Sequence, residues 1–265
     1  MKREYRKLLL TSLLLVLCAG GAWGQGYGEW GDAPEGALAY PSLAVIGSFP
    51  TCLNVAMSGF IWHSPATPWA FFGPSHEMEN EGNASLCASF NPYDADECWQ
   101  DGDAGLLFPP AYTIVNSAVV PCVHDGYLGP ACTNAQWGAN LDIFVTNTMP
   151  VVGYVNVLMD WDQNGVWAGS SNCPGGATSE HVLVDFVVPV GYAGPLSGLA
   201  PPGFLIGPNA GFVWTRFTIT EAPVGAGWIG SGVFEDGETE DYLLQIEDGV
   251  PSEDFNWGSV KNLYR

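Results

Sequence analysis

Basic residues are scarce in this sequence. It has seven Lys and Arg against 28 Asp and Glu, and four of the seven bases lie within its first seven positions. Of the acids only Glu4 lies before residue 25, which leaves 27 acids, three bases and a formal net charge of −24 from residue 25 onward. Such a charge argues against binding to nucleic acid or to anionic membranes and favours divalent cations or basic partners.

Long apolar runs are also missing, with one exception at the N-terminus. The segment 8–17 is apolar except for Thr11 and Ser12, follows the basic N-terminus and precedes the sequence Ala22-Trp23-Gly24. This pattern predicts a signal peptide over residues 1–24 and a secreted, extracellular or cell-surface protein. The run is shorter than the roughly 20 residues of a spanning helix, so no membrane insertion is expected. Cys18 raises lipidation as an alternative, but Leu17 stands where a small residue is expected.

Enzyme signatures are absent from the sequence. It has no G-x-S-x-G, no H-E-x-x-H and no phosphate-binding glycine loop, and its four histidines are scattered. We therefore predict a protein that is not an enzyme and has no catalytic residues. A hydrolase with a carboxylate pair stays as an alternative, because acids are numerous enough to pair by chance.

Six cysteines remain beyond the predicted signal peptide. An even number in an exported chain predicts disulfides, whereas zinc is disfavoured because no C-x-x-C occurs and no His stands at ligand spacing. Six cysteines allow 15 connectivities. Short spacing favours Cys87–Cys98 and Cys122–Cys132, which leaves Cys52 with Cys173. The candidates are Cys52, Cys87, Cys98, Cys122, Cys132 and Cys173.

Segments rich in β-branched and aromatic residues, bounded by turn residues, predict strands and no helices. These segments are 112–120, 140–146, 151–159, 182–190, 211–219 and 240–247. Val213, Thr215 and Phe217 alternate with Trp214 and Arg216, as in a strand with one buried face. We expect an all-β fold, an antiparallel β-sandwich of jelly-roll or immunoglobulin-like type with long disulfide-stapled loops.

The domain organisation follows from the composition. Residues 25–50 are expected to form an irregular N-terminal arm, and 51–248 a single sandwich domain whose first part, 51–110, is rich in loops. Residues 249–265 form a C-terminal tail with the bases Lys261 and Arg265.

The sharpest motif is the segment Asp160-Trp161-Asp162-Gln163-Asn164-Gly165-Val166. Side-chain oxygens of Asp160, Asp162 and Asn164 and the backbone carbonyl of Val166 match the opening of a calcium loop. Ser171 stands where an EF-hand would have its Glu, so we expect a calcium-stabilised turn between strands, completed by an acid from elsewhere. The alternative is an Asx turn without metal.

A second acidic cluster, 235–241, precedes the last predicted strand. Its like charges repel one another unless a cation or Arg216 neutralises them. Glu238 and Glu240 are therefore further metal-ligand candidates, and a solvated acidic turn is the alternative. Asp101 and Asp103 are more typical of a plain turn.

Three segments together resemble a known family. Residues 30–34 (WGDAP), 159–167 (MDWDQNGVW) and the pair Arg216-Phe217 followed by 237–242 (GETEDY) resemble, in order and spacing, the motifs of the GEVED-domain family of secreted bacterial surface proteins. Thr239 stands where that family has Val, Asn164 replaces an acid, and the cysteines are not part of the family's motifs. The resemblance covers about residues 29–247 and implies an extracellular β-sandwich in surface, adhesion-like or matrix proteins, without catalytic residues.

Low charge density and a high apolar content predict apolar contact surfaces. We expect self-association into a matrix, surface layer or filament, in which the basic tail docks on a neighbour's acidic face. Trp62, Trp69, Phe71 and Phe72 cluster in a Pro-rich segment and supply the alternative, a glycan-binding adhesion module, although such aromatics are more often core residues.

Overall fold

The computed structural model of the chain describes residues 28–55, 58–64, 68–76, 81–88, 98 and 105–248. Its regular elements are β-strands and two short 3-10 turns, η2 (Pro41–Leu43) and η3 (Leu196–Leu199), which confirms the predicted all-β class. In this part of the chain no helix is long and apolar enough to cross a membrane. The predicted signal peptide, the C-terminal tail and Asp101 and Asp103 lie outside the described residues.

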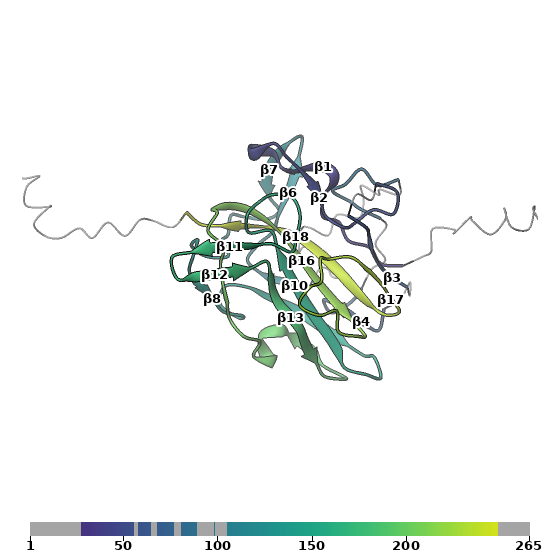
Figure 1. Cartoon of the computed structure of the whole chain (residues 1–265). Coiled ribbons are helices and arrows are strands. Elements are labelled where there is room, and N and C mark those ends of the chain that lie inside the picture. The colour runs from purple at the N-terminus through teal and green to yellow at the C-terminus, as the bar shows by residue number, and fades with distance from the viewer. Residues whose placement is uncertain are drawn as a thin grey trace, which may run out of the picture.

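The larger sheet has six strands in the order β13-β10-β16-β18-β6-β7, and all neighbours run antiparallel. Its strands are β13 (His181–Val188), β10 (Gly153–Met159), β16 (Gly211–Thr220), β18 (Gly237–Ile246), β6 (Tyr112–Val115) and β7 (Ala118–Pro121). β16 pairs with β18 along its whole length, from Gly211 opposite Ile246 to Thr220 opposite Gly237. This long pair forms the centre of the sheet (Figure 1).

The smaller sheet packs on one face of the larger one. It consists of β14 (Ala193–Pro195), β9 (Asp142–Asn147), β4 (Ala70–Phe72) and β5 (Leu106–Phe108), the last two pairing with successive parts of β9. The main core lies between the sheets, where the rings of Phe72 and Phe217 meet at 6.1 Å. The predicted β-sandwich is thereby confirmed.

Four two-stranded pairs surround these sheets. They are β1 (Glu35–Tyr40) with β2 (Val45–Ser48), β3 (Ile61–His63) with β17 (Gly232–Phe234), β8 (Asn134–Ala135) with β15 (Phe204–Leu205), and β11 (Ser170–Cys173) with β12 (Gly176–Ser179). The expected single strand over 112–120 is the hairpin β6–β7 instead. Asn116 and Ser117 both take positive φ, 51° and 64°, and make the two-residue turn.

The outer face of the larger sheet is also buried. Trp214 on β16 and Leu243 on β18 are 1% and 0% exposed, because Tyr40 and Phe49 of the N-terminal segment pack on them. The prediction of one buried face is therefore wrong for these two strands. The segment expected to be an irregular arm contains the hairpin β1–β2, which lies over this second core (Figure 1).

All six candidate cysteines are paired, but as Cys52–Cys87, Cys98–Cys122 and Cys132–Cys173, so the predicted pairing is wrong throughout. Short loop length does not decide the pairing here, because long-range packing brings distant segments together. The amide of Cys132 bonds to Gly207 O, and the sulfur of Cys173 lies beside Ile206 O. Three disulfides indicate an extracellular or otherwise oxidising environment.

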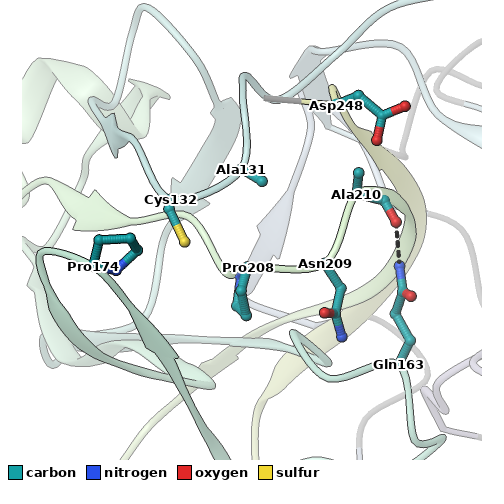
Figure 2. A pocket seen from close by; sticks show the side chains of 8 residues that line it. All are labelled: Ala131, Cys132, Gln163, Pro174, Pro208, Asn209, Ala210 and Asp248. Atoms are coloured by element: carbon teal, nitrogen blue, oxygen red, sulfur yellow. Dashed lines mark hydrogen bonds between the residues drawn. The ribbon is translucent and has the colours of Figure 1, made fainter. Parts of the chain in front are cut away.

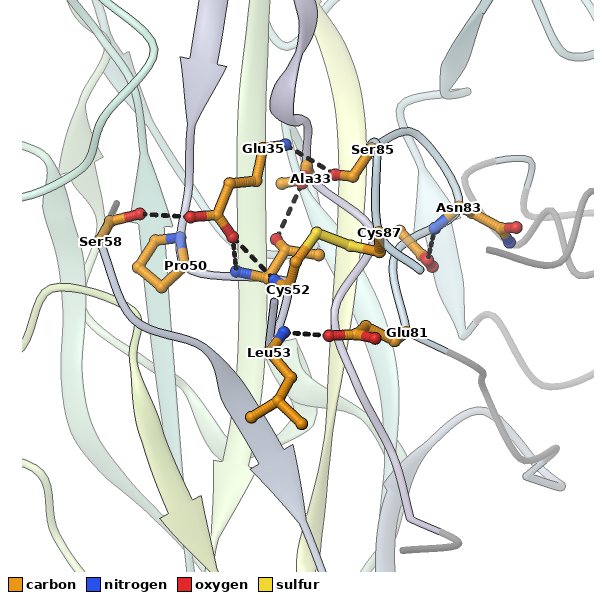
Figure 3. Close-up of a disulfide and its surroundings, with 12 residues drawn as sticks. Ala33, Glu35, Pro50, Cys52, Leu53, Ser58, Glu81, Asn83, Ser85 and Cys87 are labelled. Atoms are coloured by element: carbon orange, nitrogen blue, oxygen red, sulfur yellow. Dashed lines mark hydrogen bonds between the residues drawn. A yellow bond between two sulfur atoms is a disulfide. The ribbon is translucent and has the colours of Figure 1, made fainter. Parts of the chain in front are cut away.

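The Cys52–Cys87 disulfide lies beside buried acids (Figure 3). Glu35, which is fully buried, accepts the amide hydrogen of Cys52 at 2.8 Å, and Glu81 accepts that of Leu53. Ser85 donates to Ala33 O at 2.8 Å and accepts from the amide of Glu35. These bonds hold the first turn of the N-terminal segment against the disulfide loop.

Candidate metal centre

The loop that follows β10 is organised by one carboxylate. The amide of Asp160 still bonds to Trp214 O of β16 at 3.1 Å, and the chain then turns away from the sheet. The Asp160 carboxylate accepts the amides of Asn164 at 3.1 Å and of Gly165 at 2.8 Å. Gly165 has φ +85°, so glycine suits the position where the chain folds back.

The other predicted ligands of this loop lie close to Asp160. Asp162 accepts hydrogen bonds from the amide of Asn164 at 3.2 Å and from its side-chain nitrogen at 2.9 Å. The side-chain oxygen of Asn164 accepts from the amide of Val166 at 2.9 Å. The four candidates Asp160, Asp162, Asn164 and Val166 thus belong to one compact, oxygen-rich turn, half of it exposed to solvent.

The acid that comes to this loop from elsewhere is Glu180. It lies between β12 and β13, and its carbonyl accepts the amide of Met159 at 2.8 Å. One carboxylate oxygen, Oε2, accepts the amide of Gly169 at 2.6 Å. The other, Oε1, is buried and has no hydrogen-bond partner, although the residue is 0% exposed. Besides burial, which raises the pKa of Glu180, Asp162 acts on this carboxylate, and its backbone lowers the pKa while its side chain raises it. A buried, ionised oxygen without a close hydrogen bond is costly, and a cation would offset that cost.

Asp160, Asp162 and Glu180 form a three-carboxylate cluster. One oxygen from each lies within 4.8 Å of the others, and Asp160 and Glu180 are buried while Asp162 is exposed. Burial raises the pKa of both buried carboxyls to about 7, and neighbouring negative charge acts in the same direction. A hard divalent cation would balance this charge, and calcium takes six to eight oxygen ligands of the kinds present here.

Glu238 and Glu240 are not part of this cluster. They lie opposite Ile219 and Phe217 on β16, several residues along the strand from Trp214, which bonds to Asp160. Both are buried, Glu238 accepts the amide of Phe72, and Glu240 accepts the Tyr242 hydroxyl hydrogen at 3.0 Å. The structure therefore does not bring these two predicted ligands to the Asp160 loop.

Arg216 neutralises part of the second acidic cluster, as expected, through Asp241. The two side chains are fully buried and form a bidentate ion pair, in which Arg216 Nη2 lies 2.5 Å from Asp241 Oδ2 and Nε lies 2.8 Å from Oδ1. Asp241 also accepts the amides of Asp32 and Ala33, both at 2.8 Å. The Arg216 guanidinium lies 4.4 Å from the ring centre of Trp167. Segments 30–34, 159–167, 216–217 and 237–242 thus meet around Arg216.

The four aromatic residues proposed to bind glycans differ in their exposure to solvent. Trp69 is 56% exposed, but Phe71 and Phe72 are buried, and Phe72 belongs to the main core. Trp62 is half-buried and packs near Trp30. Of these four residues, Trp69 alone offers an open ring face.

An open pocket of about 630 Å³ is lined on one side by Cys132 and Pro174 and on another by Gln163 of the candidate metal loop (Figure 2). Gln163 borders it and donates to Ala210 O at 3.1 Å. Asp248 is its one ionisable side chain, and the remaining lining residues are Pro, Ala, Asn and the disulfide-bonded Cys132. This lining provides no pair of groups for acid–base or nucleophilic chemistry.

Sequence reasoning found the loop but missed Glu180. An isolated Glu, 18 residues beyond Asp162, carries no local signal, since its approach depends on the register of β13 against β10. No family model matches the chain, and neither does any curated protein.

Proposed function

We propose that the protein is an exported, non-enzymatic β-sandwich with a structural role at the cell surface or in an extracellular matrix, stabilised by calcium. The observation that carries the calcium part is Glu180 Oε1, a buried oxygen without a partner beside Asp160 and Asp162. Burial raises the pKa of this carboxyl to about 7, so its ionised form is disfavoured there, and a bound cation would favour the ionised form.

We also propose, on the resemblance of its three motif segments, that the chain is related to the GEVED-domain family, and these segments meet around Arg216. Asp32 and Ala33 meet Asp241 directly, and Trp167 lies under the guanidinium. Three segments that are distant in sequence thus have a common physical role, which is to bind the N-terminal segment to the central strands. That role accounts for their occurrence together in one chain.

Self-association is supported by the distribution of charge. Segments 143–159 and 186–215 contain no charged residue in a chain with 28 acids. Asn147 joins them, because its side chain donates to Val188 O at 3.0 Å and to Val151 O at 3.2 Å. Val151, Val187 and Val190 are about half exposed in these segments. Copies with the same strong negative charge can approach most easily through such an uncharged surface.

The first test combines light scattering with thermal unfolding of the oxidised protein, in calcium and then in a chelator. We expect calcium at 100 times its Kd to add about 2.7 kcal/mol to the free energy of unfolding. We also expect large particles that shrink on chelation. A melting temperature that is the same in both solutions contradicts the calcium part, and a stable monomer in both contradicts the assembly part.

Glycan binding is the second candidate, and the exposed ring of Trp69 favours it. Aromatic rings on loops can stack on sugars, and this ring is 56% exposed. Retention on polysaccharide columns that disappears in Trp69→Ala but persists in Trp62→Ala would support this function. Equal elution of both variants and the native protein would exclude it.

A further inference from the structure

The hairpin β1–β2 contacts the candidate metal loop directly. The Tyr40 hydroxyl donates to Asp160 Oδ2 at 2.8 Å, and the amide of Ser48 donates to Gly165 O at 2.7 Å. A Cβ at Gly165 would lie 2.7 Å from Ile46 O, so the loop and β2 are in close contact. Both strands of the hairpin are thus bonded to the same loop, residues 160–166.

Tyr40 connects this loop to the central sheet. The residue is 2% exposed, and its hydroxyl accepts the amide hydrogen of Trp214 at 3.0 Å while donating to Asp160. The Trp214 indole nitrogen donates to Ala39 O at 3.1 Å. The carboxylate that would bind the cation is therefore also the acceptor that orients the hairpin on β16.

A second contact lies at the end of the hairpin. The ring of Phe49 meets that of Trp167 at 4.3 Å between centroids, and both side chains are buried. Trp167 comes directly after Val166, the last residue of the metal loop, so its position depends on the conformation of that loop. The hairpin rests on the loop at Tyr40, Ser48 and Phe49, along its whole length.

The hairpin is anchored separately at both ends. Before it, Asp32 and Ala33 donate their amides to Asp241. After it, Pro50 O accepts from Arg216 at 2.5 Å, and Cys52 is disulfide-bonded to Cys87 (Figure 3). The first anchor contains no residue of the metal loop, and the second reaches only its neighbour Trp167, over whose ring the Arg216 guanidinium lies. Residues 36–49 can therefore leave the sheet while Glu35, which is bonded to Cys52 and Ser85, and the flanking segments stay bound.

We propose that the Asp160 loop is a cation-dependent latch for the hairpin of residues 36–49. This inference rests on the calcium site proposed above. With a cation bound, Asp160, Asp162 and Glu180 are drawn together, and Gly165 and Trp167 are held in the positions that the hairpin binds. Without it, repulsion among the three carboxylates loosens the loop, and the hairpin releases the aromatic surface around Trp214.

Hydrogen exchange of the full oxidised protein, read by mass spectrometry, tests the latch. Peptides covering 36–49 should exchange at least about tenfold faster in a chelator than in excess calcium, since the hairpin opens locally. Peptides covering β9 and β14 should change little. In Tyr40→Phe the loop keeps its carboxylates and should still bind calcium by titration calorimetry, but the calcium effect on hairpin exchange should shrink. Tyr154→Phe, on β10, is the matched control and should behave as the native protein.

Two outcomes would overturn the latch, and they are distinguishable. Calcium binding with hairpin exchange that does not respond to it refutes the latch and leaves the calcium site standing. No calcium binding in the native protein refutes the site and the latch together.

Discussion

Glu180 is the residue on which the proposed metal centre depends. Asp160 and Asp162 alone make a turn in which their oxygens are largely used by backbone amides. Glu180 adds a buried carboxylate oxygen without a hydrogen-bond partner. This oxygen distinguishes the loop from a plain Asx turn, because a cation would stabilise it.

Glu180→Gln should have opposite effects with and without calcium. In excess calcium the variant should be less stable than the native protein, because a charged ligand is lost and the affinity falls by about tenfold or more. In a chelator it should be the more stable of the two, because a buried charge is gone. Thermal unfolding of the variant and of the native protein, each in calcium and in a chelator, measures these differences in stability.

Glu235→Gln is the matched control for that experiment. Glu235 is exposed and lies outside the cluster, so the same loss of charge there should leave the calcium effect unchanged. A Glu180→Gln variant that keeps the full stabilisation by calcium would exclude Glu180 as a ligand.

His63 should make the fold sensitive to acid. Its Nδ1 lies 3.1 Å from Asp236 O and its Nε2 2.9 Å from the Thr239 hydroxyl. Burial, with a smaller contribution from the positive charge of Arg216, lowers the pKa of His63 to about 4, although the hydrogen bond to Asp236 O acts in the opposite direction. The other charged residues close to it are Asp236 and Glu29, the latter through its backbone.

The sign of the effect follows from proton binding. Between pH 6.5 and about 4 the unfolded chain binds a proton at His63 and the folded chain does not, so stability falls as the pH falls. The full effect is about 3 kcal/mol. The difference in free energy of unfolding between the native protein and His63→Gln, measured by urea at several pH values, isolates it. A difference that does not vary with pH would show that His63 protonates equally in both states.

At the scale of elements, the Cys132–Cys173 disulfide joins two peripheral strand pairs. Cys173 ends β11, and Cys132 stands just before β8, which pairs with β15. The bond closes a segment of 41 residues. Replacing both cysteines by Ala should lower the free energy of unfolding by about 4 kcal/mol.

Urea unfolding of the double variant and of the native protein measures this difference in the free energy of unfolding. The pocket next to the disulfide should lose its shape, while the main core should persist with an unchanged near-ultraviolet spectrum of its tryptophans. A loss below about 1 kcal/mol would mean that the β11–β12 hairpin is held by other contacts.

Much of this fold could be predicted from local sequence. The strands β9, β10, β13, β16 and β18 follow from runs of β-branched and aromatic residues, and the compact turn at 160–166 follows from the spacing of its Asp, Asn and Gly residues. The cysteine pairing, the burial of Trp214 and the approach of Glu180 could not be predicted. Each depends on contacts between segments that are distant in sequence, and a short-range pattern carries no information on these.

On the scale of the whole molecule, the uncharged segments 143–159 and 186–215 differ from the rest of the chain, which is strongly acidic. Val187 and Val190 lie in the uncharged segment and are 48% and 54% exposed. Replacing both by Asp should reduce association, because the added charges repel between copies and cost desolvation. Light scattering in calcium at equal protein concentration measures the change.

Val233→Asp is the control for this surface. Val233 is 61% exposed but lies on β17, away from the uncharged segments. Its variant should associate as the native protein does. Equal particle sizes in all three proteins would place the contact surface elsewhere or exclude association.

The proposed stabilisation by calcium and the proposed latch both require that the three carboxylates bind calcium. Titration calorimetry of the oxidised, chelator-treated protein with calcium measures this most directly. We predict saturable binding of one ion per chain that Glu180→Gln weakens and Glu235→Gln leaves intact. Heats no larger than those of dilution, or binding that is equal in all three proteins, would contradict the proposed site.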